Sequence, residues 1–284
     1  MHIRNPIEWV LSAPPDAAGE VGSASEAEYW PQTAPTKPEV RRITTNDLRA
    51  ALALGLEDFK ADRTDVVTLA IVFPIAGLFF AAVATNRHVL PLIFPLIAGF
   101  ALIGPLASIW LYELSRRREA GESPRVIDAI RLVHSPQIGS IVAMGIVQIC
   151  LFLLWLGAAD LIYLRTLGPA MPVSFSAFAR ATLTTLPGWE MIVLGIAVGF
   201  VFAVIALAIG AMSFPMLLDR KVDMPTALRI SARALYENPK TLFLWGCIVA
   251  VGLAIGSLPA LLGIAVVLPI LGHSTWHLYR RVIG

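Results

Sequence analysis

Residues 241–279 read TLFLWGCIVAVGLAIGSLPALLGIAVVLPILGHSTWHLY, a stretch of 39 residues without a single Asp, Glu, Lys or Arg. As one helix this stretch would be about 58 Å long, nearly twice the roughly 30 Å hydrocarbon core of a bilayer. The segment 256–259 (GSLP) lies near its middle, and proline ends or kinks a helix. We therefore predict two membrane spans, residues 241–257 and 259–279, joined as a tight hairpin.

Four further apolar segments precede this hairpin and have a similar length. They are residues 66–84, 89–112, 141–164 and 191–218. Hydrophobic residues make up 57% of the chain and charged residues 15%, whereas an ordinary soluble domain carries about 25% charged residues. The sequence therefore predicts an all-α polytopic membrane helix bundle with six transmembrane helices.

The positive charges predict how these spans cross the membrane. All of the 22 Lys and Arg residues except Arg87, Arg165 and Arg180 lie in the N-terminal segment, the second and fourth connections or the C-terminal end. Basic loops stay on the cytoplasmic side, so we expect both termini in the cytoplasm and the spans in the cytoplasmic membrane. Five spans would place Arg280 and Arg281 outside, which favours six.

The polar segments between the spans suggest a simple organisation. Residues 1–43 are rich in Pro, Ala, Ser and Glu and are predicted to be a disordered cytoplasmic tail, followed by a membrane domain at 44–284. Segments 47–60, 125–133 and 225–237 have amphipathic patterns typical of helices that rest on lipid or on the bundle. In the last of these, Leu228, Ala232 and Leu235 share the predicted apolar face. Each such helix followed by two spans makes a weak three-unit internal repeat.

His273 and His277 are the residues most suggestive of a bound group. Four positions apart on a helix, their imidazoles lie on one face, a spacing that can chelate a metal ion or haem. Only His134 could approach as a further ligand. The alternative is a polar helix end at the lipid headgroups, anchored by Trp276, Tyr279 and Arg280. We favour this alternative and expect no metal and no cofactor.

The other polar residues point away from catalysis and from nucleic acid. The sequence contains no nucleophile triad, no phosphate-binding glycine loop and no paired carboxylates, so we expect no enzyme activity. A basic face interleaved with aromatic residues, as nucleic acid would require, is also missing. Asp160 lies near a predicted span end, and Gln148 is expected to form a hydrogen bond across the bundle. Cys150 and Cys247 are expected to be small buried hydrophobes.

Five stretches together resemble one known family: residues 47–51 (DLRAA), 94–105 (FPLIAGFALIGP), 111–119 (LYELSRRRE), 214–220 (FPMLLDR) and 271–280 (LGHSTWHLYR). The chain is similar over about residues 45–283 to a bacterial integral-membrane family of unknown function that is common in proteobacteria. The segment before Arg41 falls outside the resemblance. The resemblance implies a membrane fold and no established activity.

Some members of that family carry a label that relates them to subunit I of cytochrome c oxidase. This chain departs from an oxidase core, because six spans are predicted here instead of about twelve, and no set of in-membrane histidines for haem and copper is present. The resemblance therefore implies at most an accessory or assembly role beside a respiratory complex.

Three functions stay open on these grounds. The first is an accessory, assembly or scaffold component of a membrane complex, which contacts the bilayer and a protein partner. The second is a small-molecule or lipid transporter, which would need a polar-lined cavity between spans. The third is a metal- or haem-binding membrane protein that uses His273 and His277. A candidate interaction surface on the cytoplasmic side consists of Tyr112, Arg116, Arg117, Asp219, Arg220, His273, Trp276, His277, Tyr279 and Arg280.

Overall fold

The structure is a computed structural model that describes residues 38–61, 90–124, 132, 135–170, 172–258 and 262–284. These residues are almost entirely helical, and the β-structure among them is an isolated antiparallel bridge between Val40 and Ile283. The prediction of an all-α chain is confirmed. The predicted span at 66–84 and all but residue 132 of the predicted amphipathic helix at 125–133 lie outside the described residues.

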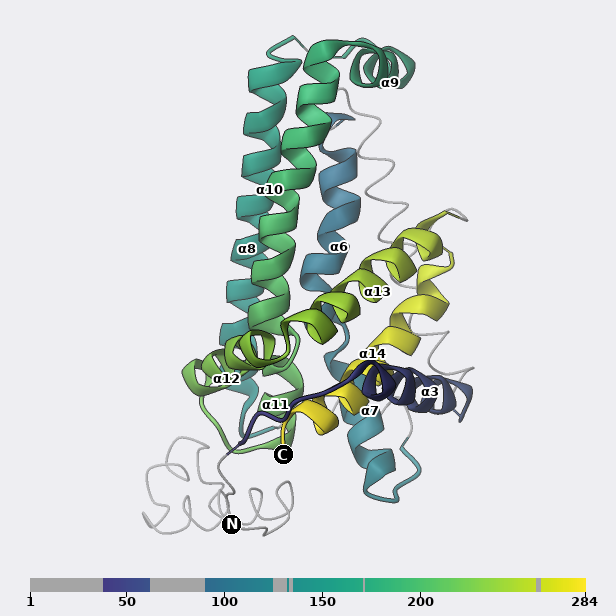
Figure 1. The fold of residues 1–284 in the computed structure, drawn as a ribbon, viewed down its shortest axis with the longest axis vertical. Helices are drawn as coiled ribbons and strands as arrows, with labels where there is room; N and C mark the ends of the chain where they lie inside the picture. The colour runs from purple at the N-terminus through teal and green to yellow at the C-terminus, as the bar shows by residue number, and fades with distance from the viewer. Residues whose placement is uncertain (1–37, 62–89, 125–131, 133–134, 171, 259–261) are drawn as a thin grey trace, which may run out of the picture.

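Three long helices run side by side in Figure 1: α6 (Ile93–Ala107), α8 (Ile138–Thr166) and α10 (Leu186–Gly210). The short 3₁₀ helix η1 (Leu90–Leu92) precedes α6, and α9 (Phe175–Thr184) lies across one end of the three. Helix α9 begins after Ser174, whose hydroxyl accepts a hydrogen bond from the Ala177 amide at 3.2 Å, which is an N-cap.

Three helices are long and apolar enough to cross a membrane within the described part of the chain. They are Ile138–Thr166, Leu186–Asp219 and α13 (Pro239–Ser257), and Leu90–Ala107 makes a fourth if its two bent halves form one span. These helices match the predicted spans at 141–164, 191–218, 241–257 and 89–112. The chain is an integral membrane protein with several apolar helices.

Helix α14 (Ile264–Val282) differs from the expected sixth span. It is 19 residues long but is not among the helices apolar enough to cross a membrane. Its second half carries His273, His277 and the two terminal arginines, and α3 (Thr45–Ala61) packs along it more extensively than any other two described helices pack together. The total of six spans stays a prediction.

The end of the molecule opposite α9 is a layer of shorter helices, which we call the base layer (Figure 1). It comprises α3, α7 (Ile109–Glu119), α11 (Ser213–Asp219), α12 (Met224–Glu237), residues 271–282 of α14 and residues 39–43. The chain enters it where helices break, at Ser108 after α6 and at 211–212 after α10. Its apolar core contains large side chains that are fully buried, among them Tyr112, Phe214, Met216, Trp276 and Tyr279.

Helix α12 packs into the base layer through small residues and two leucines. Ala227, Ser231 and Ala234 are buried, and the half-buried Leu228 and Leu235 pack against the core. The predicted face is therefore confirmed for both leucines and wrong for Ala232, which is exposed. Small side chains allow α12 to approach the break between α10 and α11 closely. There the Ser231 hydroxyl accepts a hydrogen bond from the Met212 amide at 3.2 Å.

The last residues of the predicted disordered tail are held in the base layer. The Arg41 amide donates to the Val282 carbonyl at 2.7 Å, and the Gly284 amide donates to the Glu39 carbonyl at 2.9 Å. The prediction of a tail reaching residue 43 is therefore wrong for residues 38–43, because their backbone groups find partners at the C-terminal end. Residue 40 and the C-terminus lie at the same end of the molecule.

Asn238, between α12 and α13, holds the same segment from the other side. Its Oδ1 accepts a hydrogen bond from the Ile43 amide at 2.8 Å, and its Nδ2 donates to the Arg41 carbonyl at 3.0 Å. The residue is 5% exposed. A buried side-chain amide that satisfies two backbone groups joins segments 195 residues apart.

We expect Asn238→Ala to release residues 39–43 from the base layer. The substitution leaves the Ile43 amide unsatisfied, which costs roughly 1–3 kcal/mol, so trypsin should cleave after Arg41 and Arg42 about tenfold faster. Timed proteolysis of the purified protein measures this. Glu237→Ala is the matched control, because Glu237 pairs with the exposed Arg233, and it should leave the cleavage rate unchanged. Equal cleavage of both variants would contradict the role of Asn238.

Two predictions within the apolar helices have opposite outcomes. The buried Gln148 side chain of α8 donates a hydrogen bond to the Leu102 carbonyl of α6, which confirms the expected bond across the bundle. Cys150, two residues later, is exposed on the outer face of α8, so the expectation that it is buried is wrong. A cysteine behaves as a small hydrophobe, and such a side chain is as stable in contact with lipid as it is in a protein interior.

Candidate functional site

Asp58 of α3 is the centre of a buried polar group of side chains in the base layer. Its Oδ2 accepts a hydrogen bond from the Ser115 hydroxyl of α7 at 2.6 Å and lies 2.8 Å from Nε2 of His277 on α14. Arg118 lies on its other side, with Nη1 3.3 Å from Asp58 Oδ1 and 2.9 Å from the Asp58 carbonyl oxygen. We call Asp58, Ser115, Arg118, His273 and His277 the Asp58 cluster.

The hydrogen bonds of the Asp58 cluster determine the tautomer of His273. The Ser115 hydroxyl gives its one proton to Asp58 and lies 2.8 Å from Nδ1 of His273. Because a hydroxyl has one proton and otherwise accepts, His273 must carry its proton on Nδ1 and donate it to Ser115. Its Nε2 is then an acceptor, and this atom is buried without a partner among the described residues.

The charges of the cluster follow from its burial and its hydrogen bonds. Burial acts to raise the pKa of Asp58, but the hydrogen bonds from His277 and Ser115 outweigh it and lower that pKa. Burial lowers the pKa of His273 to about 4, against the opposing effect of Asp58. At neutral pH the cluster therefore holds an ionised Asp58 and a neutral His273.

The lowered pKa of Asp58 predicts how stability depends on pH. A carboxyl group whose pKa is lower in the folded state stabilises that state above its unfolded pKa, and this contribution is lost as the pH falls through the folded value. The unfolded pKa of Asp is about 3.9, so the loss should begin near that pH. We expect the difference in melting temperature between the wild type and Asp58→Asn to narrow as the pH falls from 6 to 3. A difference that is constant over this range would contradict the ionised carboxylate.

A second polar group lies at the end of α14. The Tyr279 hydroxyl donates to Asp219 Oδ2 at 2.7 Å, and Trp276 Nε1 donates to Glu119 Oε2 at 3.0 Å. Arg280 bridges both carboxylates, with Nη1 3.2 Å from Asp219 and Nε 3.0 Å from Glu119. These bonds connect α7, α11 and α14.

Glu113 forms ion pairs with two arginines of α7. Its side chain is 1% exposed and accepts hydrogen bonds from Arg116 Nε at 2.8 Å and from Arg117 Nε at 2.6 Å. Arg117 also pairs with the more exposed Glu122 at 3.2 Å. A buried carboxylate needs such partners because an unpaired charge in the interior is very costly.

The structure revises the predicted interaction surface. Tyr112, His273, Trp276 and Tyr279 are at most 1% exposed, so they belong to the interior of the base layer and are not anchors at the lipid headgroups. The reason is that α3, α7 and α11 pack against this part of α14. Asp219, Arg220 and Arg280 do come together with Tyr279, whereas Arg116 and Arg117 pair with Glu113 in α7.

Sequence reasoning missed the acidic partners, of which Asp58 is the most important. A signal for it existed, because Ala51, Gly55 and Asp58 follow the i, i+4, i+7 spacing of one helix face. That face is the buried one in α3. An aspartate in an apolar stripe predicts a buried partner of opposite charge or a hydrogen-bond donor.

The histidine pair does not converge on a vacant position for a metal ion. His273 Nδ1 contacts Ser115 and His277 Nε2 contacts Asp58. Within the described part of the chain there is no group of three or more His, Cys, Asp or Glu residues that could hold a metal ion. His134, the further ligand considered from the sequence, lies outside the described residues.

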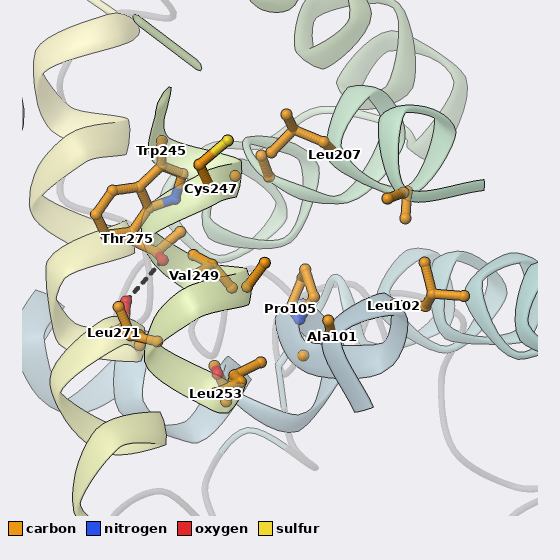
Figure 2. A pocket seen from close by; sticks show the side chains of 18 of the residues that line it. Ala101, Leu102, Pro105, Leu207, Trp245, Cys247, Val249, Leu253, Leu271 and Thr275 are labelled. Carbon is orange, nitrogen blue, oxygen red and sulfur yellow. Dashed lines mark hydrogen bonds between the residues drawn. The ribbon is translucent and has the colours of Figure 1, made fainter. Parts of the chain in front are cut away.

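A cavity of about 250 Å³ lies between α6, α10, α13 and α14 (Figure 2). Its wall is overwhelmingly apolar, and its hydroxyl groups belong to Ser108, Tyr112 and Thr275. Thr275 donates its hydroxyl proton to the Leu271 carbonyl at 2.7 Å, as the dashed line in Figure 2 shows. This is not the polar-lined cavity that the transporter hypothesis requires.

Comparison with known proteins identifies one similarity. Residues 93–219 match a family model. The family is described as "Predicted integral membrane protein (DUF2189)". The DUF2189 match begins at α6, ends with α11 and includes three of the candidate spans, so it agrees with the membrane fold. It supports the expected resemblance over this range, and α3, α12, α13 and α14 lie outside it. No curated protein and no solved structure matches the chain.

Proposed function

We propose that this protein is a non-catalytic accessory, assembly or scaffold component of a membrane complex. The observation that carries the proposal is the use of Asp58: a carboxylate that could serve as a catalytic base instead holds Ser115, Arg118 and His277 from two other helices. The groups around Asp219 and Glu113 are paired in the same way. The polar side chains of the base layer bind one another and hold its helices in place. Such a rigid layer is suited to binding other proteins.

The outer face of α12 is the best candidate for contact with a partner protein. Tyr236 is 86% exposed there, and its neighbours Arg229, Arg233 and Lys240 are exposed as well. Tyrosine and arginine are enriched among the residues that dominate protein interfaces. An exposed tyrosine among basic residues on a rigid layer favours a partner with an acidic surface.

The proposal includes the orientation expected from the charges. The base layer contains basic residues from several elements, including Arg49, Arg118 and Arg281, whereas Arg165 and Arg180 lie toward the end formed by α9. Basic residues stay on the cytoplasmic side, so the base layer would face the cytoplasm of a bacterium, with the apolar helices in the inner membrane. A respiratory complex is one candidate partner, on the family resemblance alone.

The test is gentle purification of the tagged full-length chain from its native membranes. The proposal expects another membrane protein to co-purify in a constant ratio, and Tyr236→Ala together with Arg233→Glu to reduce that ratio about tenfold, or about 1.4 kcal/mol. Arg180→Glu, on α9, is the control with a similar charge change at the opposite end. A chain that purifies alone, or a partner lost equally from the control, would refute the accessory role.

The remaining alternatives have weaker support. Metal or haem binding through His273 and His277 would require both side chains to leave Ser115 and Asp58, and it is refuted if the purified protein carries no metal and shows no haem absorbance. Transport of a polar molecule would require polar groups along a passage, whereas the wall of the described cavity is apolar. That wall instead favours a hydrocarbon.

A further inference from the structure

The cavity between α6, α10, α13 and α14 has one exposed side and one buried side. Phe200, Ala203, Phe243 and Ala250 on its wall are exposed. Leu102, Tyr112, Trp245 and Leu271 on the same wall are at most 9% exposed. The cavity is therefore open on the side of α10 and α13 and closed toward the base layer.

The open side faces the hydrocarbon of the bilayer. Helices α10 and α13, which carry the exposed wall residues, are both apolar enough to span a membrane. Phe200 and Phe243 form an edge-to-face pair at this side, with ring centroids 5.9 Å apart, and are 52% and 46% exposed. Aromatic side chains that are exposed on membrane-spanning helices contact the acyl chains of the lipid.

An apolar cavity of this size is unfavourable when empty. Side chains around a void lose dispersion contacts, and water does not fill an apolar cavity, although one of about 150 Å³ binds benzene. The cavity here has about 250 Å³, so it is larger than a site that holds an aromatic ring. The occupant that the surroundings supply in excess is hydrocarbon.

We propose that this cavity is a binding site for one acyl chain of a bilayer phospholipid. The chain enters beside the Phe200–Phe243 pair, and its end lies against Leu271 and Thr275 of α14. The hydroxyl of Thr275 already donates its hydrogen bond to the Leu271 carbonyl. It therefore needs no hydrogen-bond partner from the methyl end of an acyl chain. The headgroup stays outside, beyond the exposed rim. This site goes beyond the accessory role and does not depend on it.

Two glycines offer a matched pair of variants. Gly104 of α6 is on the cavity wall, and a Cβ built there has no atom within 4 Å. Gly157 of α8 also has open space around a Cβ, but it is not on the cavity wall. Gly104→Leu is therefore expected to place its side chain in the open space at the cavity wall, whereas Gly157→Leu makes the same substitution at an exposed position of α8 away from the cavity.

The test uses the full-length protein in phosphatidylcholine vesicles that contain a small fraction of a phosphatidylcholine with a diazirine at the end of one acyl chain. After illumination, tandem mass spectrometry locates the crosslinks. We expect crosslinks on Leu271 and Thr275, which bulk lipid does not reach, in addition to those on the exposed Leu153 and Leu154 of α8. The ratio of interior to exposed crosslinks should fall about tenfold in Gly104→Leu, equivalent to about 1.4 kcal/mol, and stay unchanged in Gly157→Leu.

Two outcomes would overturn the proposal. Crosslinks on α8 without any on Leu271 or Thr275 would mean that another occupant, such as a segment of the protein itself, fills the cavity. An unchanged ratio in Gly104→Leu would mean that the interior crosslinks do not report on this cavity. Ala203→Leu narrows the cavity from α10 and must reduce the same ratio, which keeps the proposal testable if Gly104→Leu does not fold.

Discussion

Replacing Asp58 by alanine is expected to lower the free energy of unfolding by about 3–5 kcal/mol, because several hydrogen bonds to a charged acceptor, each worth roughly 1.5–3 kcal/mol, are lost together. Arg118 would lose its carboxylate, and His277 and Ser115 would lose their acceptor. For a chain of this size such a loss corresponds to a fall of about 10 °C in melting temperature. Thermal unfolding in one detergent at one heating rate measures it.

Two further variants make this test specific. Asp160 is an exposed aspartate on α8, so Asp160→Ala should change the stability by no more than about 0.5 kcal/mol. Asp58→Asn retains the size of the side chain and an oxygen acceptor but loses the charge, and it should lie between the wild type and Asp58→Ala. Equal melting temperatures for Asp58→Ala and Asp160→Ala would show that the Asp58 cluster does not stabilise the base layer.

Gly55→Ala is expected to separate α3 from α14. A Cβ at residue 55 would overlap the Ser274 hydroxyl oxygen and would lie 2.5 Å from the Ser274 amide nitrogen and 2.7 Å from its Cα. Backbone atoms of a helix cannot move aside alone, so α3 must shift. Overpacking of this kind costs roughly 1–3 kcal/mol and occasionally more, and the shift would also pull Asp58 away from His277.

The design of the Gly55 experiment follows from this geometry. Ser274→Ala in the Gly55→Ala background removes only the hydroxyl, so it should restore little of the lost stability, because the Ser274 backbone atoms still overlap the new Cβ. Gly55→Ala combined with Asp58→Ala should cost less than the two single changes added together, because both disrupt the same helix contact. Gly157→Ala is the control and should stabilise the protein by about 0.5–1 kcal/mol, as alanine favours helix. A stable Gly55→Ala variant would show that α3 does not approach α14 so closely.

Much of the fold was predictable because a bilayer imposes a simple rule on a linear chain. A spanning helix must keep its backbone bonded within itself and must be apolar over about 20 residues, and both properties are visible in the segments that became α8, α10 and α13. The hydrogen bond of Gln148 was predictable for a related reason, since an amide within an apolar helix has to find a partner.

The candidate site was predictable only in part. The four-residue spacing of His273 and His277 predicts that they share a helix face, and both do join the Asp58 cluster. Their partners could not be predicted, because Asp58 lies 57 residues before Ser115 and 219 residues before His277 in the chain. Trp276 and Tyr279 are residue types typical of the membrane interface, yet packing by α3, α7 and α11 makes them core residues.

The apolar lengths, the amphipathic periods and the asymmetry of positive charge are local properties of this chain. They alone determine that it is a helical membrane protein, and they predict that its basic segments lie on one side. The pairing of α3 with α14, the attachment of residues 39–43, the Asp58 cluster and the apolar cavity were decided by tertiary packing. The physical reason is that the bilayer acts on each helix separately, whereas a buried charge or a void depends on which distant segments come together around it.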